Sequence, residues 1–473
     1  MTDVDAVVVG AGPNGLVAAV ALAEAGWKVV VFEAADVAGG GLRTEELTLP
    51  GFRHDIGATV LPLAAASPAF RSLGLEREGL ELAHPPVALG HALAPGRSVL
   101  LHRSASETAA GLGRDGRRWE RVLGGLGERW QGLVGSVLDP TALPPNAPRE
   151  LIEFGFHGLW PATLSMRTAF REEPTRALYA GLAAHAILPL GSLLTSGIAV
   201  FMAGLAHGVG WPVAVGGSQA VADALVARLR SLGGEVRTGH RVRSLAELPS
   251  AKAVLLDLTP RQVLAIAGET LPSGYARRLS RWRYGPGVFK VDWALDGPIP
   301  WLDPELAGAG TVHIGGSSAA TVASERAVAR GSMSDEPFVL LVQASVADAT
   351  RAPAGKQTVW AYCHVPHGSP RDETETIETR IEQFAPGFRE RILGRHTMSP
   401  AALEAWDANL IGGDIGGGMA DWRQLASRPR LSLTPWATPV PNLFLCSSST
   451  LPAGGAHGMG GWNAAKTVLR RFG

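Results

Sequence analysis

The residues GAGPNG at positions 10–15 have the types and spacing of a turn that holds the diphosphate of a dinucleotide. Gly10 permits the tight turn, Gly12 lets the backbone approach the diphosphate, and Gly15 lets the following helix pack on the preceding strand. The amino end of that helix directs N–H groups and a positive partial charge at the phosphates. We therefore predict a dinucleotide site at the start of the chain.

The elements around this turn place an acid beside it. Residues 5–9 and 28–32 are short apolar runs typical of buried parallel strands, and 16–25 is rich in helix-forming Ala, Leu and Val. Glu33 ends the second run, 21 residues after Gly12, where a carboxylate can accept both hydroxyls of a ribose. An acid there also repels a 2′-phosphate, which favours FAD or NAD over NADP.

A second glycine segment favours FAD over NAD. Gly39, Gly40, Arg43 and Thr44 follow the acid closely, where the chain can run along the diphosphate and the flavin. Arg43 would supply a fixed cation for a phosphate or for the flavin edge. The alternative for this side chain is a surface arginine in a loop.

The far end of the chain predicts the other half of the cofactor site. A strand over 443–446 precedes a glycine loop over 454–461 and a helix over 462–471. N–H groups at Gly461 and Trp462 can face the pyrimidine end of an isoalloxazine. The two ends of the chain would then bind the two ends of one FAD, and we expect that binding to be non-covalent.

These motifs make the chain similar, over nearly its whole length, to the phytoene desaturase-like flavoproteins of the amine-oxidase-type FAD superfamily. The resemblance rests on GAGPNG (10–15), GGGLRTEELTLPGFRHD (39–55), GWPVAVGGSQA (210–220), YGPGVFKVDWALDGPIPW (284–301), GGDIGGG (412–418) and LFLCSSSTLPAGGAHGMGGWNAA (443–465). It implies a split FAD domain, a substrate domain over the flavin face, and dehydrogenation, saturation or isomerisation of apolar compounds. One position departs from the pattern, because Gly41 stands where relatives often carry an arginine.

The resemblance also suggests two catalytic residues. It implies that Lys290, in a strand, points toward flavin N5, whereas the alternative is a lysine on the solvated face of a sheet. His457, in the last glycine loop, is a candidate acid or base, or a residue that stabilises the loop. His54 and Asp55 are expected to serve a turn, with a place in the cavity lining as the alternative. His185 is expected to be a core histidine, with a catalytic role as the alternative.

We expect an α/β fold with two domains. The Rossmann-like FAD-binding domain is predicted to be split into 1–65, 211–275 and 405–473. The substrate domain is predicted to be α+β, with helices and a mixed or antiparallel sheet, over 66–210 and 276–404.

Within these domains, 66–210 is predicted to be mostly helical, with Pro-rich joints over 140–148. A helix is predicted over 218–232, and strands are predicted over 236–245, 253–257, 288–295, 311–314, 338–344 and 358–364. We also expect Val242, in the strand-like stretch that returns to the FAD domain, to contact the cofactor.

Composition limits the classes of binding partner and the locations that we expect. The formal net charge is +0, so no basic surplus indicates nucleic acid. The 2 cysteines, Cys363 and Cys446, have no metal-ligand spacing, and together with the start of the chain they favour a cytoplasmic location. Residues 177–222 hold no Asp, Glu, Lys or Arg, which predicts buried helices, with peripheral membrane contact as the alternative.

The sequence therefore predicts an FAD-dependent oxidoreductase that moves a hydride between a carbon of an apolar substrate (isoprenoid, polyene or acyl-like) and flavin N5. The electron acceptor is left open. One alternative is an amine or amino-acid oxidase on the same scaffold. An alternative of another class is a flavin-free escort that binds lipids or lipid-modified proteins.

Overall fold

A five-stranded parallel sheet forms one half of the molecule in the computed structural model, which describes residues 4–142 and 145–473. The predicted joint over 140–148 lies partly outside these residues. Every strand pairs in parallel with its neighbours. The strands, in sheet order, are β16 (Leu443–Leu445), β10 (Ala253–Leu256), β1 (Ala6–Val9), β2 (Val29–Phe32) and β9 (Glu235–Arg237).

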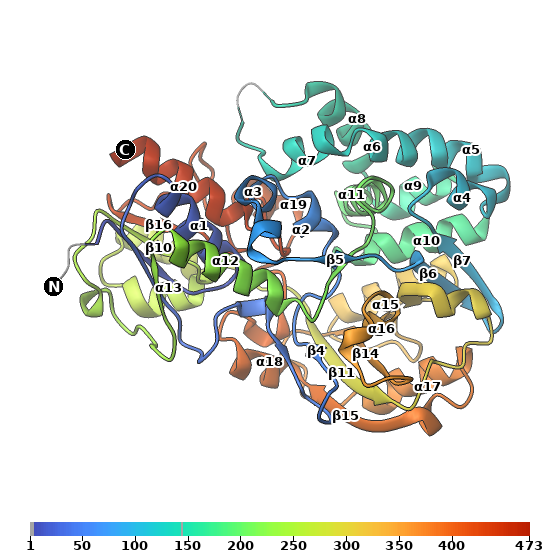
Figure 1. The fold of residues 1–473 in the computed structure, drawn as a ribbon. Coiled ribbons are helices and arrows are strands. Elements are labelled where there is room, and N and C mark those ends of the chain that lie inside the picture. The colour runs from blue at the N-terminus through green and yellow to red at the C-terminus, as the bar shows by residue number, and fades with distance from the viewer. Residues whose placement is uncertain (1–3, 143–144) are drawn as a thin grey trace.

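Helices cover both faces of this sheet, which explains why β1 and β2 are unbroken apolar runs rather than alternating ones. One face packs on α1 (Pro13–Glu24), α12 (Gln219–Ser231) and α20 (Met459–Phe472). The other packs on α13 (Pro260–Ala267) and α14 (Ser273–Ser280). The first and last helices, α1 and α20, lie side by side, and both chain ends are on this side of the molecule (Figure 1).

A seven-stranded sheet forms the other half. It is mixed, because β12 pairs with β6 in parallel while the other neighbours are antiparallel. The strands, in sheet order, are β15 (Ile392–Met398), β11 (Gly287–Leu295), β14 (Gln357–Val365), β13 (Val339–Val342), β12 (Ala309–Ile314), β6 (Val87–Ala94) and β7 (Arg97–Leu101). Together the two sheets confirm the predicted fold class.

The remaining elements surround these sheets. Two pairs of short strands are β3 (Thr44–Glu45) with β4 (His54–Asp55), and β5 (Leu82–Ala83) with β8 (Val213–Ala214). The helices not yet given are α2 (Pro62–Ala66), α3 (Pro68–Leu73), α4 (Ala105–Ala110), α5 (Gly116–Trp119), α6 (Gly125–Glu128), α7 (Trp130–Leu138), α8 (Pro148–Gly158), α9 (Ala162–Ala169), α10 (Glu173–Ala184), α11 (Thr195–Gly208), α15 (Ser318–Ala329), α16 (Ala344–Ala347), α17 (Thr374–Phe384), α18 (Pro400–Trp406) and α19 (Trp422–Ala426).

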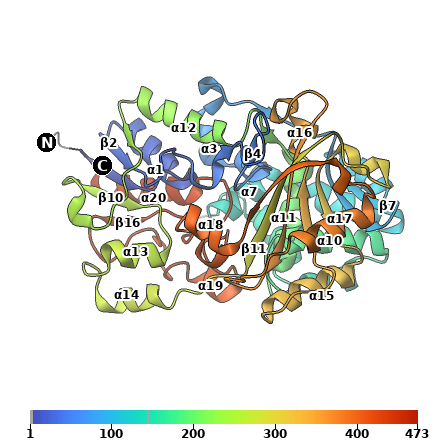
Figure 2. The ribbon, with the colours of Figure 1, turned by 90° about the horizontal axis from the view of Figure 1, so that it is seen from below.

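Each face of the seven-stranded sheet has a different neighbour. On β11, Phe289, Val291 and Trp293 point to the side covered by α17. Lys290 and Asp292 alternate with them and therefore point to the opposite side. That inner side faces the five-stranded half, and Figure 2 shows the two halves next to one another.

The uncharged run over 177–222 forms most of α10, all of α11 and the start of α12. Both α10 and α11 are largely buried, as predicted from the run. Among the helices of residues 4–142 and 145–473, none is long and apolar enough to cross a membrane.

Several predicted boundaries differ from the structure. The region 66–210 contains β6 and β7, which had been included in a mostly helical stretch. β6 consists largely of Ala and Leu, which prefer helices, so pairing within the sheet overrides local propensity there. The predicted strand over 236–245 is reduced to β9, and β15 was not predicted.

The strands of each sheet come from separate parts of the chain. Those of the five-stranded sheet lie within 1–65, 211–275 and 405–473, and those of the seven-stranded sheet lie within 66–210 and 276–404. The domain boundaries themselves stay a prediction.

Candidate active site between the two sheets

A cavity of about 1150 Å³ extends from the glycine turn to the inner side of the seven-stranded sheet. Ligand cavities usually measure about 300–1,000 Å³, so this one has room for more than a single small molecule. Its wall takes residues from the turn at 10–14, the loops at 40–43, 407–420 and 447–457, and the helices around α11. Segments from both ends of the chain therefore meet at one cavity.

The glycine turn has no space for side chains. A Cβ atom on Gly15 would lie 2.1 Å from the carbonyl oxygen of Gly10, and one on Gly12 would lie 2.8 Å from Oδ2 of Asp257. Gly10 has a φ of 100°, which favours glycine. Gly10 and Gly12 line the cavity, whereas Gly15 lies behind them in α1.

Glu33 lies beside this turn at the end of β2. Its Oε2 accepts the N–H of Ala11 at 2.6 Å, and its Oε1 accepts the N–H of Ala35 at 2.8 Å. Both Glu33 and Val242 line the cavity, and Val242 is buried. The acid is thus held next to the turn, at the position expected for a ribose.

Some residues of the segment 39–44 line the cavity, and others belong to the scaffold. Gly40 lines the cavity, and a Cβ atom there would lie 2.9 Å from Cα of Gly12, so the loop crosses the glycine turn closely. Gly39 and Thr44 do not line the cavity. The N–H of Gly39 is bonded to the carbonyl of Ala11 at 2.8 Å. Thr44 is fixed by hydrogen bonds to Asp55 and Gln219.

Arg43 lies in the wall rather than on the surface. Its guanidinium stacks 3.9 Å from the centroid of Trp406, and Nη2 donates to the Trp406 carbonyl at 3.2 Å. Nε of Arg43 is buried without a hydrogen-bond partner in the protein. A donor with no protein partner in a cavity wall fits an anionic ligand. The nearby Gly41 also lines the cavity.

The last helix begins earlier than predicted, which changes the roles of two residues. Because α20 starts at Met459, Gly461 falls within its first turn and packs on α1, where a Cβ atom would lie 1.8 Å from the carbonyl oxygen of Asn14. Trp462 packs against Lys466, with Nζ 5.3 Å from the ring centroid. Neither residue lines the cavity. The loop at 447–457 supplies the wall instead.

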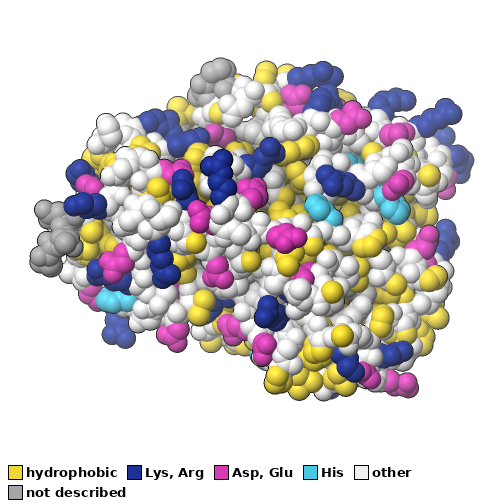
Figure 3. Space-filling view, in the orientation of Figure 1, with side chains coloured by type: hydrophobic (Ala, Val, Ile, Leu, Met, Phe, Trp, Pro, Cys, Tyr) yellow, Lys and Arg dark blue, Asp and Glu magenta, His cyan; other side chains and the backbone are white. Residues whose placement is uncertain are grey.

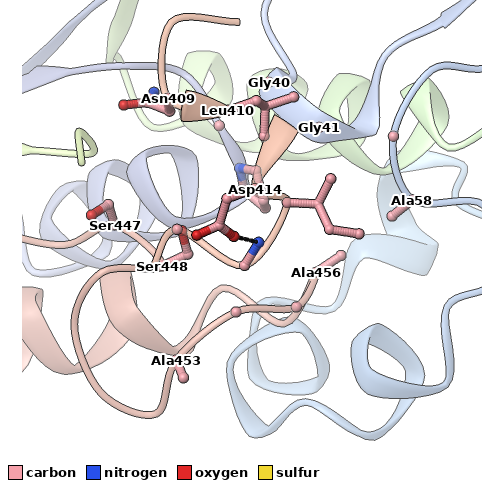
Figure 4. Close-up of a pocket in the computed structure, with 18 of the residues that line it drawn as sticks. Gly40, Gly41, Ala58, Asn409, Leu410, Asp414, Ser447, Ser448, Ala453 and Ala456 are labelled. Atoms are coloured by element: carbon pink, nitrogen blue, oxygen red, sulfur yellow. Dashed lines mark hydrogen bonds between the residues drawn. The ribbon is translucent and has the colours of Figure 1, made fainter. Parts of the chain in front are cut away.

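A buried arginine holds that loop in place. Arg428 donates from Nη2 to the carbonyls of Gly416 and Ser448, both at 2.8 Å, and burial lowers its pKa to about 10. Asp414 accepts the N–H groups of Gly285 and Gly416 at 2.7 Å, and burial raises its pKa. Figure 4 shows Asp414 beside the loops that carry Gly41, Ser448 and Ala456. Sequence reasoning missed both residues as site residues, although Asp414 lies in the quoted GGDIGGG.

Lys290 lies in the cavity wall, so the solvated-face alternative is wrong. It is buried and forms an ion pair with Asp292, which is also buried. Asp292 lies 3.6 Å from Nδ1 of His54 and 3.7 Å from Nδ1 of His396. Burial opposes ionisation of Asp292, but the adjacent Lys290 charge and His396 lower its pKa below the ordinary value. The lysine is therefore a fixed cation at the inner side of the sheet.

His457 also lines the cavity, and it is neutral at pH 7. Burial lowers its pKa to about 4, and its Nδ1 accepts the N–H of Met459 at 3.1 Å. Its carbonyl accepts the hydroxyl of Ser67. The side chain stabilises the loop, and only Nε2 is left for contact with a ligand.

The other candidates serve mainly the scaffold. Asp55 lies in the short strand β4 and forms an ion pair with the buried Arg351 at 2.9 Å, so it joins distant segments of the chain rather than serving the predicted turn. His54 is buried against Asp292, and burial lowers its pKa to about 4. His185 touches the cavity and is hydrogen-bonded to His313 at 3.1 Å, and burial lowers its pKa to about 4.

These features fit an FAD. The cavity has a glycine cradle that a single Cβ would fill, an acid beside it, an unpartnered arginine donor and, further along, a fixed cation. The outer surface of the molecule differs from this cavity, because charged side chains of both signs are interspersed on the face shown in Figure 3.

Comparison with known proteins supports the same cofactor. The chain belongs to the family described as flavin containing amine oxidoreductase, which it matches over residues 14–328. It is 27% identical to the rat (Rattus norvegicus) pyridine nucleotide-disulfide oxidoreductase domain-containing protein 2, over 98% of this chain and 93% of that protein. The protein is therefore an FAD-dependent oxidoreductase, and a flavin-free escort is not supported.

Two further similarities are with a relative that matches part of the chain and with a solved structure. One of the subunits of limonene dehydrogenase from Castellaniella defragrans is 38% identical over 110 residues, which is 23% of this chain and 20% of that protein. Putrescine oxidase, solved with bound putrescine, has the same fold with a TM-score of 0.60 and 19% identity, over 99% of this chain and 98% of that chain.

Proposed function

We propose that this oxidoreductase acts on an apolar substrate of isoprenoid, polyene or acyl type, in the manner of phytoene desaturase-like enzymes. FAD, held non-covalently, supplies a hydride acceptor or donor at N5. The reaction would be desaturation, saturation or isomerisation. The observation that supports this proposal is the chemistry of the cavity wall beyond the cofactor region.

That wall is apolar and nearly uncharged. Among the described residues, the segments 66–210 and 276–404 contribute one charged side chain to it, Lys290. Its large members include Phe154, Ile187, Leu188, Leu194, Ile198, Phe201, Met202, Leu340, Val342, Trp360 and Tyr362, and Trp211 lies directly after the first segment. Burial of apolar surface contributes about 25 cal/mol per Å², so a long hydrocarbon gains much from this wall.

The same wall is unfavourable for an ammonium group. A buried ammonium needs a carboxylate or several acceptors, and the one ion that this part of the chain contributes to the wall is the cation Lys290. Asp292 is close to that wall but is already paired with the lysine. The charge of the wall thus disfavours a protonated amine.

Lys290 has the position of a catalytic residue in this proposal. Asp292 fixes its ammonium on the inner side of the sheet, and the ring centroid of Trp360 lies 5.1 Å from Nζ. A fixed cation beside the reacting centre stabilises negative charge that develops there, and its N–H groups can hold a water for proton transfer. Asp292 acts as a positioning residue.

An amine oxidase is the competing candidate, and the family description and the putrescine oxidase fold favour it. The test is flavin bleaching without oxygen, screened against a panel of small amines and a panel of isoprenoid and acyl compounds. We expect bleaching by members of the apolar panel. Rapid bleaching by a small amine, with no response to any apolar donor, would overturn the proposal.

The surface beside the cavity supports delivery of such a substrate from a lipid phase. Seven exposed apolar side chains, here called the α8 patch, lie on α8, α9 and α19 and in the loops that join α8 to α9 and α10 to α11: Ile152, Phe156, Leu159, Trp160, Leu164, Leu193 and Trp422. Leu159 and Leu193 also line the cavity, and Leu193 and Trp422 share a small hollow. We propose that this patch contacts a membrane surface peripherally.

A further inference from the structure

The three glycines of the turn all face one acidic side chain, Asp257. It follows β10, which pairs with β1. Cβ atoms on Gly12 and Gly15 would lie 2.8 and 3.1 Å from Asp257 Oδ2, and one on Gly10 would lie 2.9 Å from the Asp257 carbonyl oxygen. A carboxyl group therefore occupies the space that these three glycines leave free behind the predicted diphosphate turn.

Asp257 binds a backbone donor at the amino end of α1, directly behind the glycines that line the cavity. Its Oδ2 accepts the N–H of Gly15 at 2.8 Å, in the first turn of α1. The side chain is buried and lines the cavity. Among the hydrogen bonds and ion pairs of the described residues, none joins Asp257 to a lysine or an arginine.

The surroundings of Asp257 disfavour its charged form. Burial, opposed by the Gly15 N–H and assisted by the carboxylates of Asp407 and Glu33, raises the pKa of Asp257 to about 7. Cys446, at the end of β16, faces it and is a neutral thiol, because burial raises its own pKa well above the usual range. At neutral pH the group is near its midpoint in the protein without ligand.

A bound dinucleotide adds negative charge at this point. The turn and the amino end of α1 are the diphosphate site that the glycine pattern defines. A diphosphate repels an ionised carboxylate in a buried site, since like charges favour protonation of the group that can accept a proton. A protonated carboxyl can keep its bond to Gly15 through one oxygen and offer its O–H as a donor.

We propose that Asp257 is a cofactor-binding residue that must carry a proton while FAD is bound. Above neutral pH, Asp257 is a carboxylate in the apoprotein. The protein must therefore take up one proton when it binds FAD, and the complex contains a neutral carboxyl group. FAD affinity is consequently coupled to pH. This inference concerns the cofactor and does not depend on the proposed substrate.

The experiment measures FAD binding to the apoprotein by flavin fluorescence between pH 6 and 9, with no turnover. We expect the dissociation constant to be nearly flat below about pH 7 and to rise by about tenfold per pH unit above it. Calorimetry at pH 8, in two buffers that differ in ionisation enthalpy, should show uptake of about one proton per FAD.

Two variants make the result specific. Asp257→Asn keeps the shape and an acceptor for Gly15 but cannot titrate, so its affinity should not change with pH and its proton uptake should vanish. Glu33→Gln is the matched control, a neutralised acid at the same turn. It should retain the slope and the proton uptake, with the onset moved to lower pH because the Glu33 charge no longer raises the pKa of Asp257. A pH-independent wild-type affinity without proton uptake, or an unchanged slope in a folded Asp257→Asn protein, would overturn the proposal. If that variant does not fold, the wild-type proton uptake still decides.

Discussion

The two halves of the molecule specify their parts of the cavity in different ways. In the five-stranded half, backbone approaches backbone: the critical contacts are those of Gly15 with Gly10, Gly40 with Gly12, and Gly461 with Asn14. Each contact is possible only for glycine, so its position is visible in the sequence. In the seven-stranded half the wall consists of large apolar side chains that many residue types could replace.

The two halves also differ in how they stabilise buried charged groups. Beside the cofactor turn, carboxyl groups receive backbone N–H bonds, as Glu33 and Asp257 do. Beside the substrate wall, one lysine and one aspartate neutralise each other. A change of a single partner should therefore cost most in the second half, where no backbone group replaces the lost charge.

The largest effect is expected for Lys290→Met. It leaves Asp292 buried without its cation, and removal of one partner of a buried ion pair typically costs about 3–5 kcal/mol. We expect a loss of that size in the free energy of unfolding of the apoprotein, measured with urea. Flavin reduction or reoxidation should also slow by about tenfold or more, because a fixed cation of this kind typically contributes at least that much.

The control for this change is Lys290→Met combined with Asp292→Asn. Because the double variant buries no unpaired charge, it should recover most of the stability but not the rate. If the single variant matched the wild type in both stability and flavin kinetics, Lys290 would have no part in the wall's electrostatics.

The next effect concerns the cofactor half. Glu33→Ala removes the expected bonds to a ribose and also the acceptor for the N–H groups of Ala11 and Ala35. Loss of charge-assisted hydrogen bonds should weaken FAD binding by about 1.5–3 kcal/mol, which is roughly ten- to a hundredfold. Titration of the apoprotein with FAD checks this. An unchanged dissociation constant, with the fold intact, would show that Glu33 does not face the ribose.

The contrast between the halves explains what could be predicted from the sequence. The unit of β1, α1 and β2 follows directly from its glycines and its apolar runs. The strands β11, β12, β13 and β14 are recognisable from their β-branched and aromatic residues. By contrast, β6 has the composition of a helix, and β15 is a half-exposed strand that contains Arg395 and His396, so only their partners in the sheet define them.

The site was predictable to a similar extent. The residues Gly12, Gly40, Glu33, Arg43 and Lys290 were found from spacing or resemblance, and all of them line the cavity. Asp257 and Arg428 were missed, because their role depends on which strand and which loop lie beside them in space. Gly461 and Trp462 were expected at the flavin because the start of α20 was placed three residues too late, at 462 rather than Met459.

Buried histidines such as His91 should make the protein less stable in acid. Burial lowers the pKa of His91, in the seven-stranded half, to about 4. The unfolded chain binds a proton near pH 6.5 and the folded protein does not until about pH 4, so stability falls as the pH decreases through this range. One such group costs about 2 kcal/mol at pH 5. Comparing urea unfolding at pH 7.5 and 5, we expect His91→Gln to lose less stability than the wild type, by about that amount.

Glutamine is chosen because its amide can keep the bond that Nε2 of His91 makes with the carbonyl of Gly316 at 2.9 Å. A variant that loses as much stability at pH 5 as the wild type would indicate that His91 does not stay neutral in the folded protein.

The smallest effect is expected at the α8 patch, which would connect the apolar half to a lipid phase. Ile152 and Phe156 are 74% and 71% exposed, so their replacement should leave the fold unchanged. Burying such side chains in a lipid surface contributes about 1.5–3 kcal/mol each when complete. Partial insertion of the pair should be worth about 1.4 kcal/mol, or tenfold in affinity. We therefore expect Ile152→Ser with Phe156→Ser to weaken flotation with phospholipid vesicles by about tenfold.

The matched control is Leu393→Ser on β15, an apolar side chain that is 45% exposed and lies outside the patch. Equal vesicle binding by the double variant and the control would show that Ile152 and Phe156 do not contact the vesicle surface, and would contradict the proposed membrane contact of the patch.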